Sequence, residues 1–194
     1  MSSSPVPLSS TGHLPGIHPA ELAEAVVRLG EVVRLEAQLT ARRVGFGWRP
    51  CVDAPDGYDR LRAAYRQSKR TGVALPVSNL YCDRTIYGDA DTNVAMRFWH
   101  DVHHVERGCD FSALEEVELA LWHLDVLCRH GLEPTGLSWR LLHADLVGQT
   151  YCSALLGHFP DDQRQFVLDC VAGGLEWALL VESGRKPEHV AIAA

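Results

Sequence analysis

The residues best suited to chemistry begin in the segment 97–104, which reads RFWHDVHH. His100 and His104 are four residues apart, so on a helix both imidazoles lie on one face and can reach the same atom. Asp101 and Arg97 lie on that face as well. A solvated helix face is usually built from Lys and Glu, so two imidazoles beside an aspartate favour a binding site. The alternative, a plain solvated face, depends on what the neighbouring helices contribute.

Further ionisable side chains occur inside apolar segments. Glu116 and His123 are seven residues apart and share the apolar face of the segment 112–130, where an unpaired carboxylate is costly. Asp145 and Gln149 are four residues apart in the segment 136–157, which is apolar almost all round. Ionisable groups in such surroundings cluster at functional sites, so we expect neighbouring helices to bring these side chains together.

The pattern predicts that His100, His104 and Glu116 bind one divalent metal, with Asp145 as a further ligand or as the partner of a ligand. Mixed nitrogen and oxygen ligands suit zinc, iron or manganese, and two histidines with one carboxylate form the open site of non-haem iron enzymes. Helical bundles build metal sites from inward carboxylates and histidines. Asp101 is expected to orient a histidine or act as a base, and Arg97 to hold an anionic group of a small-molecule substrate. Hydrolysis by a metal-activated water is the simplest reaction for such a site.

Other histidines remain candidates for the same site. His123 is a candidate because it shares an azimuth with Glu116, and it is equally explained as a core histidine with satisfied hydrogen bonds. His103 and His143 are spare ligand candidates, and His143 is also explained as a core residue. These assignments depend on which helices are neighbours.

A second hypothesis needs no metal. Here the chain is a non-catalytic accessory or interaction protein, and Glu116 pairs with Arg97 or His123 in a structural network. Removing one partner of such a buried pair costs roughly 3–5 kcal/mol. The variant His100→Ala separates the hypotheses: it abolishes metal uptake and activity in an enzyme, but changes only the melting temperature in a structural network.

A helical framework is expected to position these residues. Hydrophobic periodicity predicts an all-α helical bundle in which four C-terminal helices pack with an N-terminal helix, Pro19–Arg43. The four C-terminal helices are expected at 92–107, 112–130, 136–157 and 161–183. Short connections between them imply antiparallel neighbours.

The remaining segments are less regular. A helix is predicted from Gly57 to Ser68, and the segment 73–91, rich in Asn, Asp and Gly, is predicted to be an irregular ordered loop. A short strand or hairpin inside it is the alternative. Residues 1–17 are predicted to be a disordered tail, and 18–194 a single α-helical domain.

Local signals predict where three of these helices start. Asp91 or Thr92 is expected to cap the helix 92–107, and Ser112 with Glu115 to form a capping box before the next. Pro160 is expected in the first turn of the last helix.

Two short motifs resemble known enzymes. The spacing HDxxH, which begins at His100, resembles the HExxH of zinc peptidases, with Asp in place of the Glu that acts as general base. The His100-Asp101 pair also resembles HD-type metal-dependent phosphohydrolases and the oxygenases that share their helical fold. Those families have a further upstream histidine, whereas none occurs between His18 and His100. The resemblance implies Asp125 or Asp145 as the distal aspartate.

A longer resemblance covers residues 93–170. The motifs RxWHDxxH, FSxxxE, DxxGQxY and FPxDQxxF occur in this order, and together they resemble a family of small uncharacterised proteins of bacteriophages and other mobile elements. The position of Asp145 is commonly Glu in that family. The resemblance implies that Gln149, Tyr151 and Gln163 matter, with Gln149 as a catalytic candidate. Both glutamines are equally explained as partners of buried backbone groups.

Composition limits the partners and the compartment. The 194 residues are 46% hydrophobic and 22% charged, with a net charge of -7, which argues against general nucleic-acid binding. A local basic patch stays open at Arg60, Arg62, Arg66, Lys69 and Arg70. No apolar run approaches the ~20 residues of a membrane span, and the N-terminus lacks a secretory signal, so a cytoplasmic protein without a membrane is expected. Six cysteines without a CxxC pair indicate reduced, buried thiols.

Overall fold

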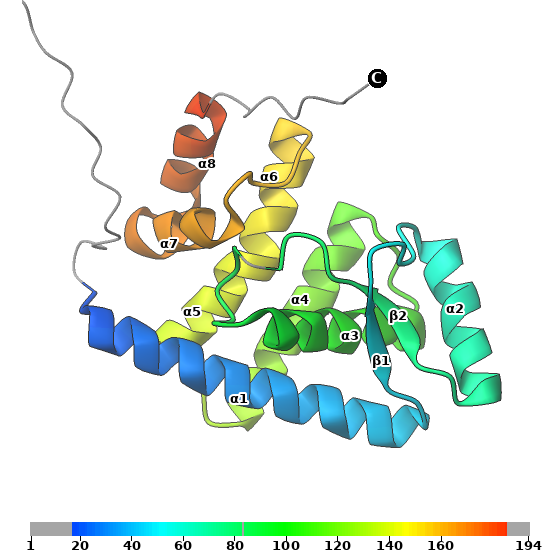
Figure 1. The fold of residues 1–194 in the computed structure, drawn as a ribbon. Coiled ribbons are helices and arrows are strands. Elements are labelled where there is room, and N and C mark those ends of the chain that lie inside the picture. The colour runs from blue at the N-terminus through cyan, green and yellow to red at the C-terminus, as the bar shows by residue number, and fades with distance from the viewer. Residues whose placement is uncertain (1–16, 83, 186–194) are drawn as a thin grey trace, which may run out of the picture.

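The computed structural model describes residues 17–82 and 84–185 and is built mainly from helices, as predicted (Figure 1). The helices are α1 Pro19–Val44, α2 Tyr58–Thr71, α3 Ala90–Arg107, α4 Ala113–Arg129, α5 Leu137–His143, α6 Gln149–Leu156, α7 Gln163–Gly173 and α8 Leu175–Gly184. A π-helical turn, η1 Ala144–Gly148, joins α5 to α6, and the strands are β1 Trp48–Cys51 and β2 Leu75–Ser78. Strands β1 and β2 with α2 lie at one end of the molecule, and α7 with α8 at the other.

Helices α1 and α3 pack along each other and carry much of the main core. The face of α1 that meets the core includes the fully buried Leu29, Val33 and Ala37. Pro19 occupies the first turn of α1, and His18 caps it by accepting a hydrogen bond from the Ala20 N–H at 3.2 Å. Ile17, the last residue of the predicted tail 1–17, is half-buried against the same core; the other residues of that tail lie outside the described residues.

The segment 73–91 contains a short strand, the alternative to the predicted loop, because four of its residues form β2. This strand pairs with β1 in parallel, and the register places Trp48 beside Leu75. Parallel strands need a long crossover, which α2 supplies. The pairing packs Trp48 on Phe98 of α3, with ring centroids 4.7 Å apart. The strand therefore depends on contacts with distant residues, which local sequence signals do not contain.

Two of the predicted C-terminal helices are interrupted. The segment 136–157 forms α5 and α6 with the π turn η1 between them, so Asp145 lies in a widened turn. The predicted helix 161–183 is divided at Gly174, whose φ of 88° and ψ of 166° suit only glycine. The chain changes direction there, and α8 turns away from the axis of α7 while packing against it (Figure 1).

The helix starts also differ from the predicted ones. Asp89 caps α3, its Oδ1 accepting from the Thr92 N–H at 2.7 Å, in place of Asp91 or Thr92. Ser112 precedes α4 without a side-chain capping bond, so the predicted capping box is absent at this described position. Asp162, two residues beyond Pro160, caps α7 by accepting from Gln165.

The surface agrees only in part with the sequence-based expectations. In the basic segment of α2, Arg60 forms an ion pair with Asp56 at 2.6 Å, and Arg62 lies 3.7 Å from Asp59. These two acidic partners neutralise part of the positive charge of the segment. All six cysteines are free; three are buried, but Cys128 is exposed, contrary to the prediction.

Among the described residues, no helix has the length and apolar character needed to cross a membrane.

Candidate metal centre

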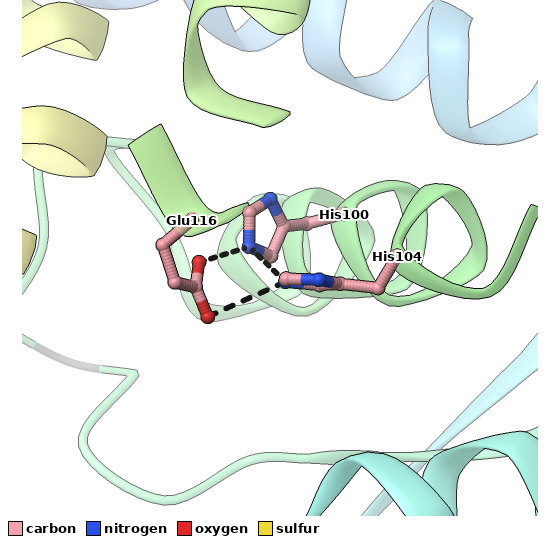
Figure 2. A group of neighbouring side chains, drawn as sticks. All are labelled: His100, His104 and Glu116. Carbon is pink, nitrogen blue, oxygen red and sulfur yellow. Dashed lines mark hydrogen bonds and ion pairs between the residues drawn. The ribbon is translucent and has the colours of Figure 1, made fainter. Parts of the chain in front are cut away.

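Three predicted ligands meet between α3 and α4. His100 and His104 lie one turn apart on α3, and Glu116 extends toward them from the first turn of α4. Figure 2 shows the two imidazoles and the carboxylate pointing toward one another. The two Nε2 atoms are 2.9 Å apart; Glu116 Oε2 is 3.2 Å from His100 Nε2, and Oε1 is 3.4 Å from His104 Nε2.

These separations suit one metal ion. Zinc binds imidazole nitrogen and carboxylate oxygen at about 2.0–2.2 Å, so donor atoms of one coordination sphere lie roughly 3.0–3.5 Å apart. The three contacts fall in or very near this range, and within the described part of the chain these residues form a group able to hold a metal ion. Two nitrogens and one carboxylate suit zinc, iron or manganese and leave positions for further ligands.

Backbone contacts fix the orientation of His104. Its Nδ1 lies 3.0 Å from the carbonyl oxygen of Cys109, which can only accept, so Nδ1 carries the hydrogen. When the imidazole is neutral, the lone pair is therefore on Nε2, facing His100 and Glu116. A carbonyl partner on the second nitrogen is typical of metal-binding histidines. The His104 side chain is only 1% exposed, which leaves little freedom to turn away.

The charges of the group are strongly coupled. Burial alone would raise the pKa of Glu116, but hydrogen bonds from His100 and His104 outweigh it and lower the pKa to about 2. Burial lowers the pKa of His100, whereas at His104 the hydrogen bond to Glu116 overcomes burial and raises the pKa. The metal-free group thus holds a proton on His104 more readily than on His100.

Asp101 and Arg97 lie beside this group. Asp101 is half-buried, and burial raises its pKa to about 7, against the opposing charges of His104 and Arg97. Arg97 donates from Nη1 to the carbonyl oxygen of Ser78 at 2.9 Å, so β2 holds the guanidinium in place. The second hypothesis offered Arg97 or His123 as the partner of Glu116; among the described residues Glu116 instead contacts His100 and His104.

Asp145 is buried as predicted, but the structure gives it other partners than the metal group. The Tyr87 hydroxyl donates to its Oδ2 and the Gln149 side chain to its Oδ1, both at 2.6 Å. Burial raises the pKa of Asp145 to about 6, which these two bonds and Arg97 partly oppose. Asp145 is not one of the three residues whose ligand atoms come together. The positive charge of Arg97 lowers the pKa of both Asp145 and Asp101, so the two carboxyl groups share one electrostatic partner.

The remaining histidine candidates have distinct positions. His123 is fully buried, and its Nε2 lies 3.1 Å from Nδ1 of His100, so it contacts a predicted ligand from behind. His103 donates from Nδ1 to the Trp99 carbonyl and receives Arg43 at Nε2, which leaves neither nitrogen for a metal. His143 is stacked on Trp139 with ring centroids 5.1 Å apart and lies outside the group.

The three residues implied only by resemblance differ in their burial and contacts. Gln149 is buried against Asp145 and does not serve a backbone group, whereas Tyr151 is 44% exposed. Gln163 is half-buried at the start of α7.

Tyr87 and the Cys109 carbonyl were not found from the sequence. Tyr87 lies in the segment 73–91, where no periodicity indicates which side chains turn inward. Its isolated aromatic ring among turn residues is the available signal, because a buried tyrosine hydroxyl needs a partner. A backbone carbonyl such as that of Cys109 leaves no signal in residue types at all.

A cavity in another part of the fold lies away from this group. It has a volume of about 300 Å³ and lies between α1, α3 and β1, lined by Arg34, Trp48, Val94 and Ala95 among others. The metal group instead reaches solvent through its own side chains, since Glu116 is 26% and His100 17% exposed.

Comparison with known proteins adds no family: no family model, no curated protein and no solved structure matches the chain. The resemblances to HD-type enzymes and to small phage proteins therefore stay predictions.

Proposed function

We propose that this chain binds one divalent metal ion through Nε2 of His100, Nε2 of His104 and the carboxylate of Glu116, and uses it as a hydrolase. The observation that carries the proposal is the convergence of three ligand atoms at 2.9–3.4 Å from two helices. A solvated polar face does not require this convergence. The carbonyl behind His104 supports it further.

The metal would supply Lewis-acid chemistry and the activation of water. The chain would contribute Asp101, a half-buried carboxyl adjacent to His100 whose pKa of about 7 suits proton exchange at neutral pH. Arg97, anchored on Ser78, would bind an anionic group of the substrate. The same arginine favours the ionised forms of Asp101 and Asp145, because its positive charge lowers the pKa of both.

A small phosphoester is the substrate class we propose to test first. The His100-Asp101 pair supports a phosphohydrolase of the HD type, and Arg97 offers a guanidinium that suits phosphate geometry. Oxygen chemistry on iron is the next reaction, because two histidines and one carboxylate also make up the ligand set of non-haem iron oxygenases. The order of motifs across residues 93–170 supports a mobile-element origin.

Elemental analysis tests the metal site directly. The protein is purified without a polyhistidine tag or chelator, alongside His100→Ala, Glu116→Ala and the control His143→Ala. We expect about one zinc, iron or manganese per chain in the parent and in His143→Ala, and little in the other two. Circular dichroism confirms that all four are folded. Absence of metal from the parent, even after reconstitution, would exclude the proposal.

The choice of activity assay depends on which metal is found. With zinc or manganese, hydrolysis of simple aryl phosphate monoesters and diesters is measured, and with iron, oxygen consumption as well. His100→Ala should abolish turnover, whereas Asp101→Asn should retain the metal and lose most of the rate.

A structural network remains the second candidate. The observation in its favour is that Glu116 is bound by both imidazoles without any metal, so the carboxylate is not left unsatisfied. Under this hypothesis the chain acts through partners, and His100→Ala changes the melting temperature alone. The elemental analysis above distinguishes the two candidates.

A further inference from the structure

His123 contacts the metal group only through His100. It comes from the middle of α4, is 0% exposed, and places Nε2 3.1 Å from the Nδ1 atom of His100. Its other nitrogen, Nδ1, is buried and has no hydrogen-bond partner among the described residues. A buried imidazole in this position either helps to position His100 or only fills space.

Aromatic rings surround His123. Trp99 lies 4.1 Å away between ring centroids and Trp122 5.0 Å away, both tilted steeply to the imidazole, and His103 lies at 5.9 Å. Aromatic faces carry partial negative charge, so an N–H is tolerated among them better than a bare lone pair. The unpartnered Nδ1 of His123 is therefore expected to carry the hydrogen, which leaves the lone pair on Nε2.

From this arrangement we propose that His123 is the positioning residue of the metal site, accepting the Nδ1–H of His100 and thereby directing the Nε2 lone pair of His100 at the metal. The inference rests on the proposed function, because only a metal-binding site needs that lone pair. A neutral imidazole has one N–H and one lone pair, so the hydrogen bond behind His100 decides which nitrogen faces forward. If His123 donated instead, Nε2 of His100 would carry a hydrogen toward the metal position and oppose binding.

The two ligand histidines are then oriented in the same way. The Cys109 carbonyl accepts from Nδ1 of His104, and His123 accepts from Nδ1 of His100. With the metal bound, both Nε2 atoms would then present their lone pairs to it. His123 is thereby excluded as a ligand, since its lone pair is used on His100 and its other nitrogen is buried without a hydrogen-bond partner among the described residues.

Zinc affinity of matched variants tests the assignment. His123→Phe keeps an aromatic ring among the tryptophans but cannot accept, whereas His123→Asn is smaller and offers an acceptor oxygen. His103→Phe is the control, because it removes another buried imidazole from the same aromatic cluster without touching His100. The dissociation constant for Zn²⁺ is measured by competition with a chromophoric chelator, and the melting temperature of each metal-free protein is measured beside it.

The expected result is a 10–100-fold weaker Zn²⁺ affinity in His123→Phe, as for other lost partners of metal-binding histidines. His123→Asn should recover part of it, and His103→Phe should bind like the parent even where its melting temperature falls. A His123→Phe protein that binds Zn²⁺ within threefold of the parent would overturn the inference while leaving the proposed function standing. A parent that binds no metal would overturn both.

A second measurement needs no variant. In protein labelled with ¹⁵N at histidine, long-range proton–nitrogen correlation identifies which ring nitrogen carries hydrogen. With Zn²⁺ bound, His100 and His123 should both be protonated at Nδ1. Hydrogen on Nε2 of His123 would contradict the inference even if His123→Phe failed to fold.

Discussion

Replacing Glu116 by glutamine should reveal how much the carboxylate stabilises the metal-free fold. Its pKa of about 2 lies below the ordinary value of 4.5, and one pKa unit corresponds to about 1.4 kcal/mol. The ionised carboxylate therefore contributes on the order of 3 kcal/mol to the free energy of unfolding. The side chain is three-quarters buried, so solvent screening reduces this only moderately.

The sign of the pH dependence follows from both partners. Because the pKa of Glu116 is lowered by folding, its contribution is complete above pH 4.5 and is lost as pH falls through about 2. Because the pKa of His104 is raised, its contribution is complete below pH 6.5 and is lost as pH rises through the folded value. The difference between the parent and Glu116→Gln should thus be largest between pH 4.5 and 6.5.

Urea unfolding followed by far-ultraviolet circular dichroism measures this difference, from pH 3 to 8.5 with a chelator present. Glu118→Gln, an exposed change two residues along α4, serves as the control and should stay within about 0.5 kcal/mol of the parent. The reasoning is refuted if Glu116→Gln is as stable as the parent at pH 5.5. A difference that stays constant over the whole pH range would refute it as well.

Three further results are expected elsewhere in the fold. Tyr87→Phe removes a hydrogen bond to the buried Asp145 and should cost about 1–3 kcal/mol in urea unfolding; an unchanged midpoint would contradict the contact. In the parent, the raised pKa of Asp145 makes stability fall as pH rises from about 4 to 6, and Asp145→Asn should flatten that fall, which unfolding at several pH values checks. Gly174→Ala should cost about 1–3 kcal/mol because φ there is 88°, whereas Gly184→Ala, with open space around it, should leave the melting temperature nearly unchanged.

The histidines and Glu116 could be predicted to meet because helical periodicity fixes their directions. His100 and His104 share a face by spacing alone, and Glu116 lies on the apolar face of α4, where a carboxylate requires partners. The structure brings these three together. Their role as metal ligands is a proposal that the spacing and the distances support jointly.

Asp145 shows where such reasoning ends. Its burial was predictable from the apolar surroundings, but its partner Tyr87 lies in a segment without periodicity, and the π turn around Asp145 shifts its direction from that of a regular helix. Strand β1 was equally hidden, because its four residues acquire their structure only by pairing with β2, across the whole of α2. The break at Gly174 was also not predicted, because the apolar periodicity of the sequence continues through it.

The π turn also has a consequence for the length of the chain. A π turn accommodates one residue more than a regular turn, so η1 acts as a one-residue insertion between α5 and α6. Deleting a single residue from 144–148 would restore a regular turn and leave α6 facing nearly the same way, because the wide turn absorbs the extra residue. Cys152 would then stay in the small core that it shares with Phe166 and Ala178. We therefore expect such a deletion to act within the turn itself, on the direction of Asp145, rather than on the packing of α6.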